Sequence, residues 1–151
     1  MAEETQKERI DREIIELLNE LRVTLPGVQV MFAFLLILPF QPAFGELSGF
    51  ELAIYLVAFL ATTAATILLI TPASFHRLRF RARDKERMLR ISNRLAIAGI
   101  LCLAVAITAA VYLVTEVLFG DLIAVAVAVA VAGSAALFWF AVPLYGKIDD
   151  D

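Results

Sequence analysis

Residues 95–142 contain only two charged side chains in 48 positions and read LAIAGILCLAVAITAAVYLVTEVLFGDLIAVAVAVAVAGSAALFWFAV. Glu116 and Asp121 divide this segment into two apolar runs. The runs cover residues 95–114 and 122–142, each close to the roughly 20 residues that an α-helix needs to cross about 30 Å of hydrocarbon. The segment therefore predicts two membrane-spanning helices joined by a short turn.

The composition of the whole chain leads to the same class of protein. The chain has 151 residues, of which 61% are hydrophobic, and its mean hydropathy is +0.83. An ordinary soluble domain is about 45–50% apolar, and a domain of ~150 residues still exposes roughly 30% of its unfolded surface. A single core of this size cannot hide so much apolar surface, and disordered chains are far less apolar. We therefore expect an integral membrane protein.

Two further apolar spans, residues 23–44 and 50–70, precede this segment. The first contains three prolines, Pro26, Pro39 and Pro42. Because proline interrupts the hydrogen bonds of a helix, we expect this span to be short or kinked and to end near the far membrane interface. The predicted fold is all-α, a four-helix transmembrane bundle within residues 23–144.

The distribution of lysine and arginine predicts the orientation of the bundle. All thirteen basic residues lie in residues 1–22, in the loop 71–94 and in the acidic tail 145–151. Four crossings place these three segments on one side of the membrane. The loops around 45–50 and 115–121 contain no lysine or arginine. Since cytoplasmic loops are enriched in basic residues, we expect both termini in the cytoplasm of a multi-pass protein of the inner (plasma) membrane.

Local signals predict where the spans begin and end. Ser48 and Glu51 fit a capping box that opens the second span. Pro72 is expected to end that span, Asp121 to cap the N-terminus of the fourth, and Pro143 to follow the end of the fourth. We interpret the acidic residues here as helix caps and as hydrated groups at the membrane edge.

Residues 1–22 are expected to form an amphipathic juxtamembrane helix. Its apolar residues recur at a 4-3-4 spacing, as Ile10, Ile14, Leu17 and Leu21. The helix could lie on the inner leaflet, form a coiled coil, or pack against the cytoplasmic end of the bundle close to the basic loop. With seven acidic and four basic residues the segment is unlike the basic interfacial helices, and its charge favours the third interpretation.

The loop 71–94 carries eight basic and two acidic residues. Basic and apolar residues alternate in its first half, and the candidates for contact with anionic lipid headgroups are His76, Arg77, Arg79, Arg81 and Arg83. The same pattern also serves as a topology determinant, and both interpretations can hold together. We do not expect nucleic-acid binding, because the phosphates of the membrane already supply anions beside this loop.

Inside the spans the notable residues are small or polar. Residues at four-residue spacing predict a helix-packing stripe that includes Ala98, Cys102, Ala106, Ala128 and Ala132. Such stripes let helix backbones approach closely, either within the bundle or between copies in a homo-oligomer. Gln29, Thr62 and Thr66 are the candidates for intramembrane polar contacts, either as interhelical hydrogen bonds or as the lining of a polar path.

The chain offers little for catalysis. It has one histidine and one cysteine, no glycine-rich phosphate loop, and no nucleophile placed beside a base. We therefore expect no catalytic residues, no metal site, no cofactor and no enzymatic activity. Coupled ion transport normally needs an ionisable residue inside the membrane, and none lies in mid-span.

Several motifs carry a family resemblance. They are LNELRV at 18–23, GVQV at 27–30, FAFLLILPFQ at 32–41, FHR at 75–77, NRLA at 93–96, FWF at 138–140 and PL at 143–144. Over about residues 11–145 the chain resembles a family of small membrane proteins of about this length, found mainly in actinobacteria and classed as a domain of unknown function. The resemblance implies four spans, and members sometimes carry the label sodium/proton antiporter. It supplies no catalytic residues.

We therefore expect a non-enzymatic accessory or structural protein that acts through helix packing and anionic-lipid contact. Its expected partners are the lipid bilayer, anionic lipids and further copies of itself, without nucleic acid or a small-molecule substrate. The alternative is a small cation/proton antiporter or a subunit of one.

Overall fold

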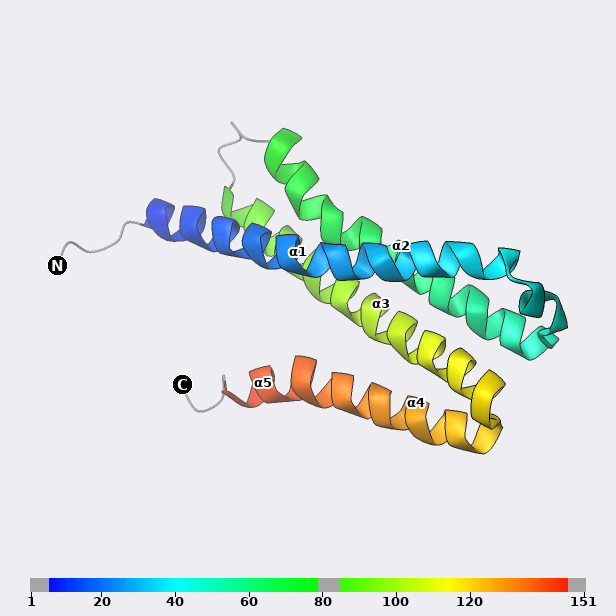
Figure 1. The fold of residues 1–151 in the computed structure, drawn as a ribbon. Helices are drawn as coiled ribbons and strands as arrows, with labels where there is room; N and C mark the ends of the chain where they lie inside the picture. The colour runs from blue at the N-terminus through cyan, green and yellow to red at the C-terminus, as the bar shows by residue number, and fades with distance from the viewer. Residues whose placement is uncertain (1–5, 79–84, 147–151) are drawn as a thin grey trace. The chain divides into compact units, whose positions relative to one another are not determined.

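The computed structural model describes residues 6–78 and 85–146, and in these ranges it contains helices and turns without strands (Figure 1). The long helices are α1 (Gln6–Ile37), α2 (Gly49–Leu78), α3 (Lys85–Phe119) and α4 (Asp121–Ala135). Two short 3-10 helices (Leu38–Phe40 and Pro42–Glu46), a π-helix (Ala136–Ala141) and α5 (Val142–Gly146) complete the described residues. Four helical segments are long and apolar enough to cross a membrane. The predicted all-α fold with four spans is confirmed, and the chain is a membrane protein.

The first helix differs from the one expected. We predicted an amphipathic segment over residues 1–22 followed by a separate span, short or kinked because of its three prolines, that ends near Pro39 and Pro42. Instead, α1 continues for 32 residues with Pro26 inside it. Arg22, whose carbonyl loses its donor to Pro26, is exposed at the end of the polar segment, where water can replace that donor. The helix ends at Ile37, and the prolines at 39 and 42 lie in the 3-10 helices that follow.

The chain divides into two compact units. The first consists of residues 1–37 and 62–103, and so contains α1 with the second half of α2 and the first half of α3. Its α1 residues Ile14, Leu21, Val28 and Leu35 are all buried and recur every seven positions. A seven-residue repeat keeps one side of a helix against its neighbours along its length, as in left-handed helix packing.

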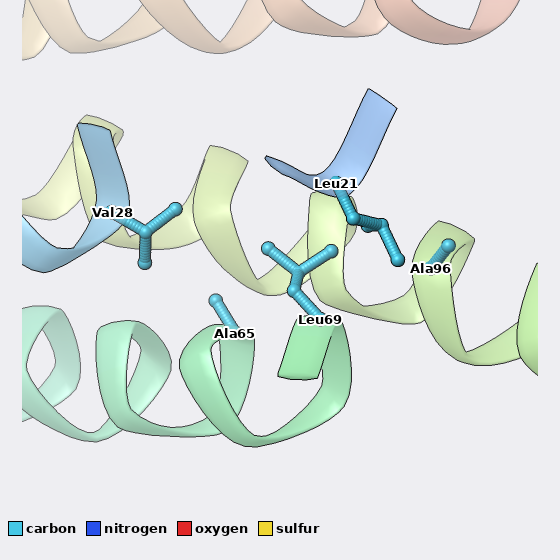
Figure 2. Packing of buried hydrophobic residues seen from close by; sticks show 5 residues of the cluster. All are labelled: Leu21, Val28, Ala65, Leu69 and Ala96. Carbon is cyan, nitrogen blue, oxygen red and sulfur yellow. The ribbon is translucent and has the colours of Figure 1, made fainter. Parts of the chain in front are cut away.

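The buried cluster of this unit contains residues from three helices: Leu21, Val28, Ala65, Leu69 and Ala96. Figure 2 shows the Leu69 side chain reaching from α2 toward Leu21 and Val28 of α1. Leu17 packs against the same cluster, and Ile14 is only 6% exposed. The apolar stripe of the N-terminal segment therefore packs within the unit, which agrees with the third interpretation of that segment.

In this unit α2 and α3 approach each other closely at Gly99. A Cβ atom added to Gly99 would lie 2.7 Å from Cγ of Leu69 and 3.3 Å from Cβ of Leu68. These distances are shorter than van der Waals contact, so only glycine lets the two backbones approach this closely.

The second helix also extends beyond its predicted end. We expected Pro72 to stop the span, but α2 continues to Leu78 with Pro72 buried inside it. The hydroxyl groups on either side donate to backbone carbonyls four positions earlier, Thr71 to Ile67 at 2.7 Å and Ser74 to Ile70 at 3.5 Å. Serine and threonine hydroxyls of this kind help a membrane helix to tolerate proline.

The second unit consists of residues 38–61 and 104–151. The predicted capping box at its α2 N-terminus is confirmed: the backbone N–H of Ser48 donates to Oε2 of Glu51 at 2.6 Å, and the backbone N–H of Glu51 donates to Oγ of Ser48 at 3.3 Å. Next to this cap, Phe44 contacts Tyr55 edge-on with ring centroids 5.0 Å apart. These contacts connect the preceding 3-10 segment to the first turns of α2.

A single residue, Gly120, joins α3 to α4. Its φ of 85° lies in a region that side-chain-bearing residues rarely adopt. Its N–H donates to the carbonyl of Glu116 at 2.8 Å, and its carbonyl accepts from Ala124 at 3.1 Å. The N-cap of α4 is therefore Gly120 and not Asp121 as predicted, because the one-residue turn makes Asp121 the first helical residue.

The end of α4 also differs from the prediction. The α-helix gives way at Ala136 to a π-helical turn, and α5 then carries the chain past Pro143. Proline cannot donate to the carbonyl of Trp139, four positions earlier, and the π-helix lies directly before it. The chain is thus helical to Gly146, whereas the segment that is apolar enough to cross a membrane ends at Ala141, within one residue of the predicted end of the span at 142.

Candidate functional site

Basic side chains gather at the C-terminal end of α2 and in the first turns of α3. His76 and Arg77 occupy the last turn of α2. The basic residues in the first ten positions of α3 are Lys85, Arg87, Arg90 and Arg94. The other predicted lipid contacts, Arg79, Arg81 and Arg83, lie outside the described residues. The structure thus places the basic side chains of the described helices beside the loop, at the ends of two consecutive spans.

Lys85 and Arg90 form ion pairs. Nζ of Lys85 lies 2.5 Å from Oδ1 of Asp11 and so connects the start of α3 to α1. Arg90 pairs with Glu86 one turn earlier at 3.0 Å. Exposed pairs of this kind contribute about 0–1 kcal/mol, so the Lys85–Asp11 pair adds little stability and marks where α3 begins beside α1. Sequence spacing did not identify it, because the partners are 74 residues apart.

A groove with many carboxylates lies between α1 and α3 in the same unit. Its volume is about 430 Å³, and its lining residues are Glu13, Glu16, Leu17, Glu20, Glu86, Leu89, Arg90 and Asn93. We refer to it as the α1–α3 groove. It combines four carboxylates with one guanidinium over two leucines. The acidic character of residues 1–22 is evident from the sequence, but the groove is not, because its lining comes from two helices far apart in the chain.

The predicted intramembrane polar residues differ in their surroundings. Thr62 is fully buried, whereas Gln29 is exposed. The hydroxyl of Thr66 donates to the carbonyl of Thr62 at 2.9 Å, so its donor is satisfied within its own helix. None of these three residues lines the α1–α3 groove or the apolar groove described next. The arrangement resembles ordinary helix packing more than a polar path.

The predicted packing stripe is divided between buried and exposed positions. Ala106 is fully buried in the second unit, and Ala98 and Cys102 are half-buried in the first. On α4, Ala124 is the buried residue, Ala128 is half-buried and Ala132 is exposed. An apolar groove of about 400 Å³ runs between α3 and α4, and its lining includes Ala104, Ile107, Ala130, Ser134 and Trp139. Most residues of α4 are therefore exposed within the described part of the chain.

A group of acidic residues lies at the opposite ends of α2 and α3. The hydroxyl of Tyr112 donates to Oδ1 of Asp121 at 2.7 Å, and the ring of Tyr112 contacts Phe50 edge-on with centroids 6.1 Å apart. One carboxyl oxygen of Glu116, Oε2, is buried without a hydrogen-bond partner. The role of Tyr112 was not predicted from the sequence, where the signal for it is its position nine residues before Asp121, on the other side of a glycine turn.

The described residues contain no group of three or more histidine, cysteine, aspartate or glutamate side chains that could hold a metal ion. The free thiol of Cys102 is half-buried.

Comparison with known proteins gives a match along nearly the whole chain. The model of a family of unknown function, DUF6328, matches residues 3–143. The chain belongs to this family. No curated protein and no solved structure matches it. Membership of DUF6328 confirms the resemblance drawn from the sequence motifs, and the length of about 150 residues fits. The family has no assigned activity, so membership lends no support to an antiporter label.

Proposed function

We propose that this DUF6328 member is a non-enzymatic accessory protein of the inner (plasma) membrane, with both termini in the cytoplasm. In this proposal it acts by packing its helices and by binding anionic lipid headgroups through the basic ends of α2 and α3. The non-enzymatic part rests on the sequence, which pairs no nucleophile with a base.

One observation carries the lipid part of the proposal. Arg77 at the end of α2, and Arg87 and Arg94 in the first turns of α3, are all exposed at the ends of consecutive spans. Such positions place guanidinium groups at the depth of lipid headgroups. Each basic residue near an anionic surface contributes about 1 kcal/mol of attraction. Positive charge of this kind also favours the cytoplasmic side, which supports the orientation.

The test compares lipids that differ in headgroup charge. The purified chain is placed in nanodiscs of phosphatidylcholine with or without phosphatidylglycerol, and its thermal unfolding is measured in each. We expect phosphatidylglycerol to raise the melting temperature of the wild type. The double variant Arg77→Gln/Arg94→Gln should lose most of that increase.

A matched control separates binding from a general charge effect. Arg9 and Arg12 lie on α1, where they pair with Glu13 and Glu16. The double variant Arg9→Gln/Arg12→Gln removes the same charge and should keep the wild-type response. An equal response to both lipids, or an equal loss in the two double variants, would contradict the proposal.

The antiporter alternative predicts a different outcome. It requires a hydrated path, but Gln29 is exposed while Thr62 is buried. In proteoliposomes with an imposed pH gradient, our proposal predicts no sodium or potassium flux above that of empty liposomes. Robust flux that is lost on substitution of Glu51, Glu116 or Asp121 would establish transport in its place.

A further inference from the structure

The α1–α3 groove presents negative charge over an apolar floor. Its four glutamates outnumber its single arginine, and Leu17 and Leu89 lie between them. Three of the glutamates have an arginine partner one turn away, Arg9 for Glu13, Arg12 for Glu16 and Arg90 for Glu86. These are exposed pairs on single helices, which are weak and readily exchanged. The groove is therefore suited to an occupant that combines positive charge with an apolar side chain.

The same two turns of α3 carry such a combination on another side. Arg87 and Arg94 are seven residues apart, so they lie on one side of the helix, with Ile91 between them. All three side chains are exposed. We refer to them as the α3 ridge. At about 100° per residue the ridge lies roughly a third of a turn from the residues of α3 that line the groove.

The α1–α3 groove and the α3 ridge lie at the same depth relative to the membrane. The groove uses residues 86–93 of α3, and the ridge uses residues 87–94. Two copies that are inserted in the same direction hold these turns at the same depth. The ridge of one copy can therefore reach the groove of its neighbour by lateral diffusion alone.

We propose that the α1–α3 groove binds the α3 ridge of a second copy, so that two copies form a symmetric dimer. Because groove and ridge are adjacent on one helix, a two-fold axis along the membrane normal makes both contacts at once, each ridge in the other's groove. The arginines then face the glutamates, and Ile91 faces Leu17 and Leu89. This association uses Arg87 and Arg94, which the proposed lipid contact also uses, but it needs no anionic lipid, so the two are tested in different lipids.

The test is energy transfer between donor- and acceptor-labelled chains in liposomes of phosphatidylcholine alone, at low ionic strength. Neutral lipid removes bridging through headgroups. We expect wild-type chains to show transfer above that of a dilution control, and 0.5 M NaCl to lower it several-fold because exposed charges are screened. No transfer, or transfer that salt leaves unchanged, overturns the proposal.

Charge reversal then identifies the surfaces. Chains with the groove reversed (Glu16→Arg/Glu20→Arg) should not associate with one another, and neither should chains with the ridge reversed (Arg87→Glu/Arg94→Glu). In a mixture of the two variants, the positive groove of one chain faces the negative ridge of the other. The unchanged ridge and the unchanged groove face each other at the second contact. Both contacts are then attractive, and energy transfer should recover. Wild-type transfer in either single-variant sample, or no recovery in a mixture of folded variants, overturns the proposal.

Two controls change the same charges elsewhere. Glu46→Arg and Arg77→Glu alter exposed residues outside the groove and the ridge. Both should keep wild-type transfer, and melting temperatures in detergent verify that every variant is folded. Equal losses in these controls would show a general charge effect and would also overturn the proposal. Association through the small residues of α4 would leave all reversal variants unaffected.

Discussion

The hydroxyl of Tyr112 on α3 donates to Oδ1 of Asp121 on α4 at 2.7 Å, across the one-residue turn at Gly120. Tyr112 is only 9% exposed and also contacts Phe50 of α2. The side chain therefore connects the first residue of α4 to the two helices before it. Since Ala124 is the only residue of α4 that is fully buried, we expect this bond to contribute to the attachment of that helix in the second unit.

Replacing Tyr112 with phenylalanine tests this attachment. The ring and its contact with Phe50 remain, but the donor to the carboxylate is lost. Hydrogen bonds to charged groups contribute about 1.5–3 kcal/mol, and exposure at the helix end reduces that, so we expect a loss of about 1–2 kcal/mol. Thermal unfolding in detergent measures the change. Tyr145→Phe at an exposed position should have no effect, and equal stability of the two variants would rule out the attachment.

The turn itself makes a second prediction. Gly120 has a φ of 85°, so Gly120→Ala introduces a Cβ into a strained backbone conformation. We expect a cost of about 1–3 kcal/mol. Gly27 is a matched control, because it lies inside α1 with no atom within 4 Å of an added Cβ. Gly27→Ala should be neutral or stabilising by up to about 1 kcal/mol. If both alanine variants melt at the same temperature, the turn is not strained as described.

The fold class could be predicted from the sequence because lipid, as the solvent, restricts the conformations of a long apolar segment. Uncharged runs of about 20 residues have few alternatives to a helix in lipid. The errors occurred at prolines and at a turn. Pro26 and Pro72 are tolerated within helices, through hydration at the polar end of α1 and through hydroxyl groups in α2. Asp121 was predicted as a cap because the side chain suits that role, but the one-residue connection gives the position to Gly120.

The candidate site was predicted less completely, because its contacts join distant parts of the chain. The basic residues at the end of α2 were identified from composition alone, and so was the acidic character of the N-terminal segment. The pair between Lys85 and Asp11 requires knowing that α1 lies beside α3. The α1–α3 groove requires the same knowledge. Spacing within one helix could not supply it.

The capping box gives Glu51 a structural role as a hydrogen-bond acceptor at the start of α2. Its carboxylate accepts from the backbone N–H of Ser48 at 2.6 Å. Glu51→Ala removes this acceptor and should lower stability by about 0.5–2 kcal/mol, whereas Glu51→Gln keeps an oxygen acceptor and should recover at least half of that loss. Unfolding in detergent measures both. Glu46→Ala serves as the control, because Glu46 is an exposed acid of the preceding segment. Equal losses for alanine and glutamine would contradict the cap.

The approach of Gly99 to Leu69 gives the most direct test of the packing in the first unit. A Cβ on residue 99 would lie 2.7 Å from Cγ of Leu69, so Gly99→Ala forces side chains or backbone to move. Overpacking of this kind costs about 1–3 kcal/mol. Gly133→Ala is the control, because no atom lies within 4 Å of its added Cβ.

A double-mutant cycle shows whether the cost comes from this contact. Leu69→Ala alone removes a fully buried side chain and should cost about 2–5 kcal/mol. In the double variant the new methyl group of residue 99 occupies part of the space that Leu69 leaves. The double variant should therefore lose less stability than the sum of the losses in the two single variants. We expect a favourable coupling of about 0.5–3 kcal/mol from thermal unfolding of the four proteins. Strict additivity would mean that the two helices do not approach each other at these residues.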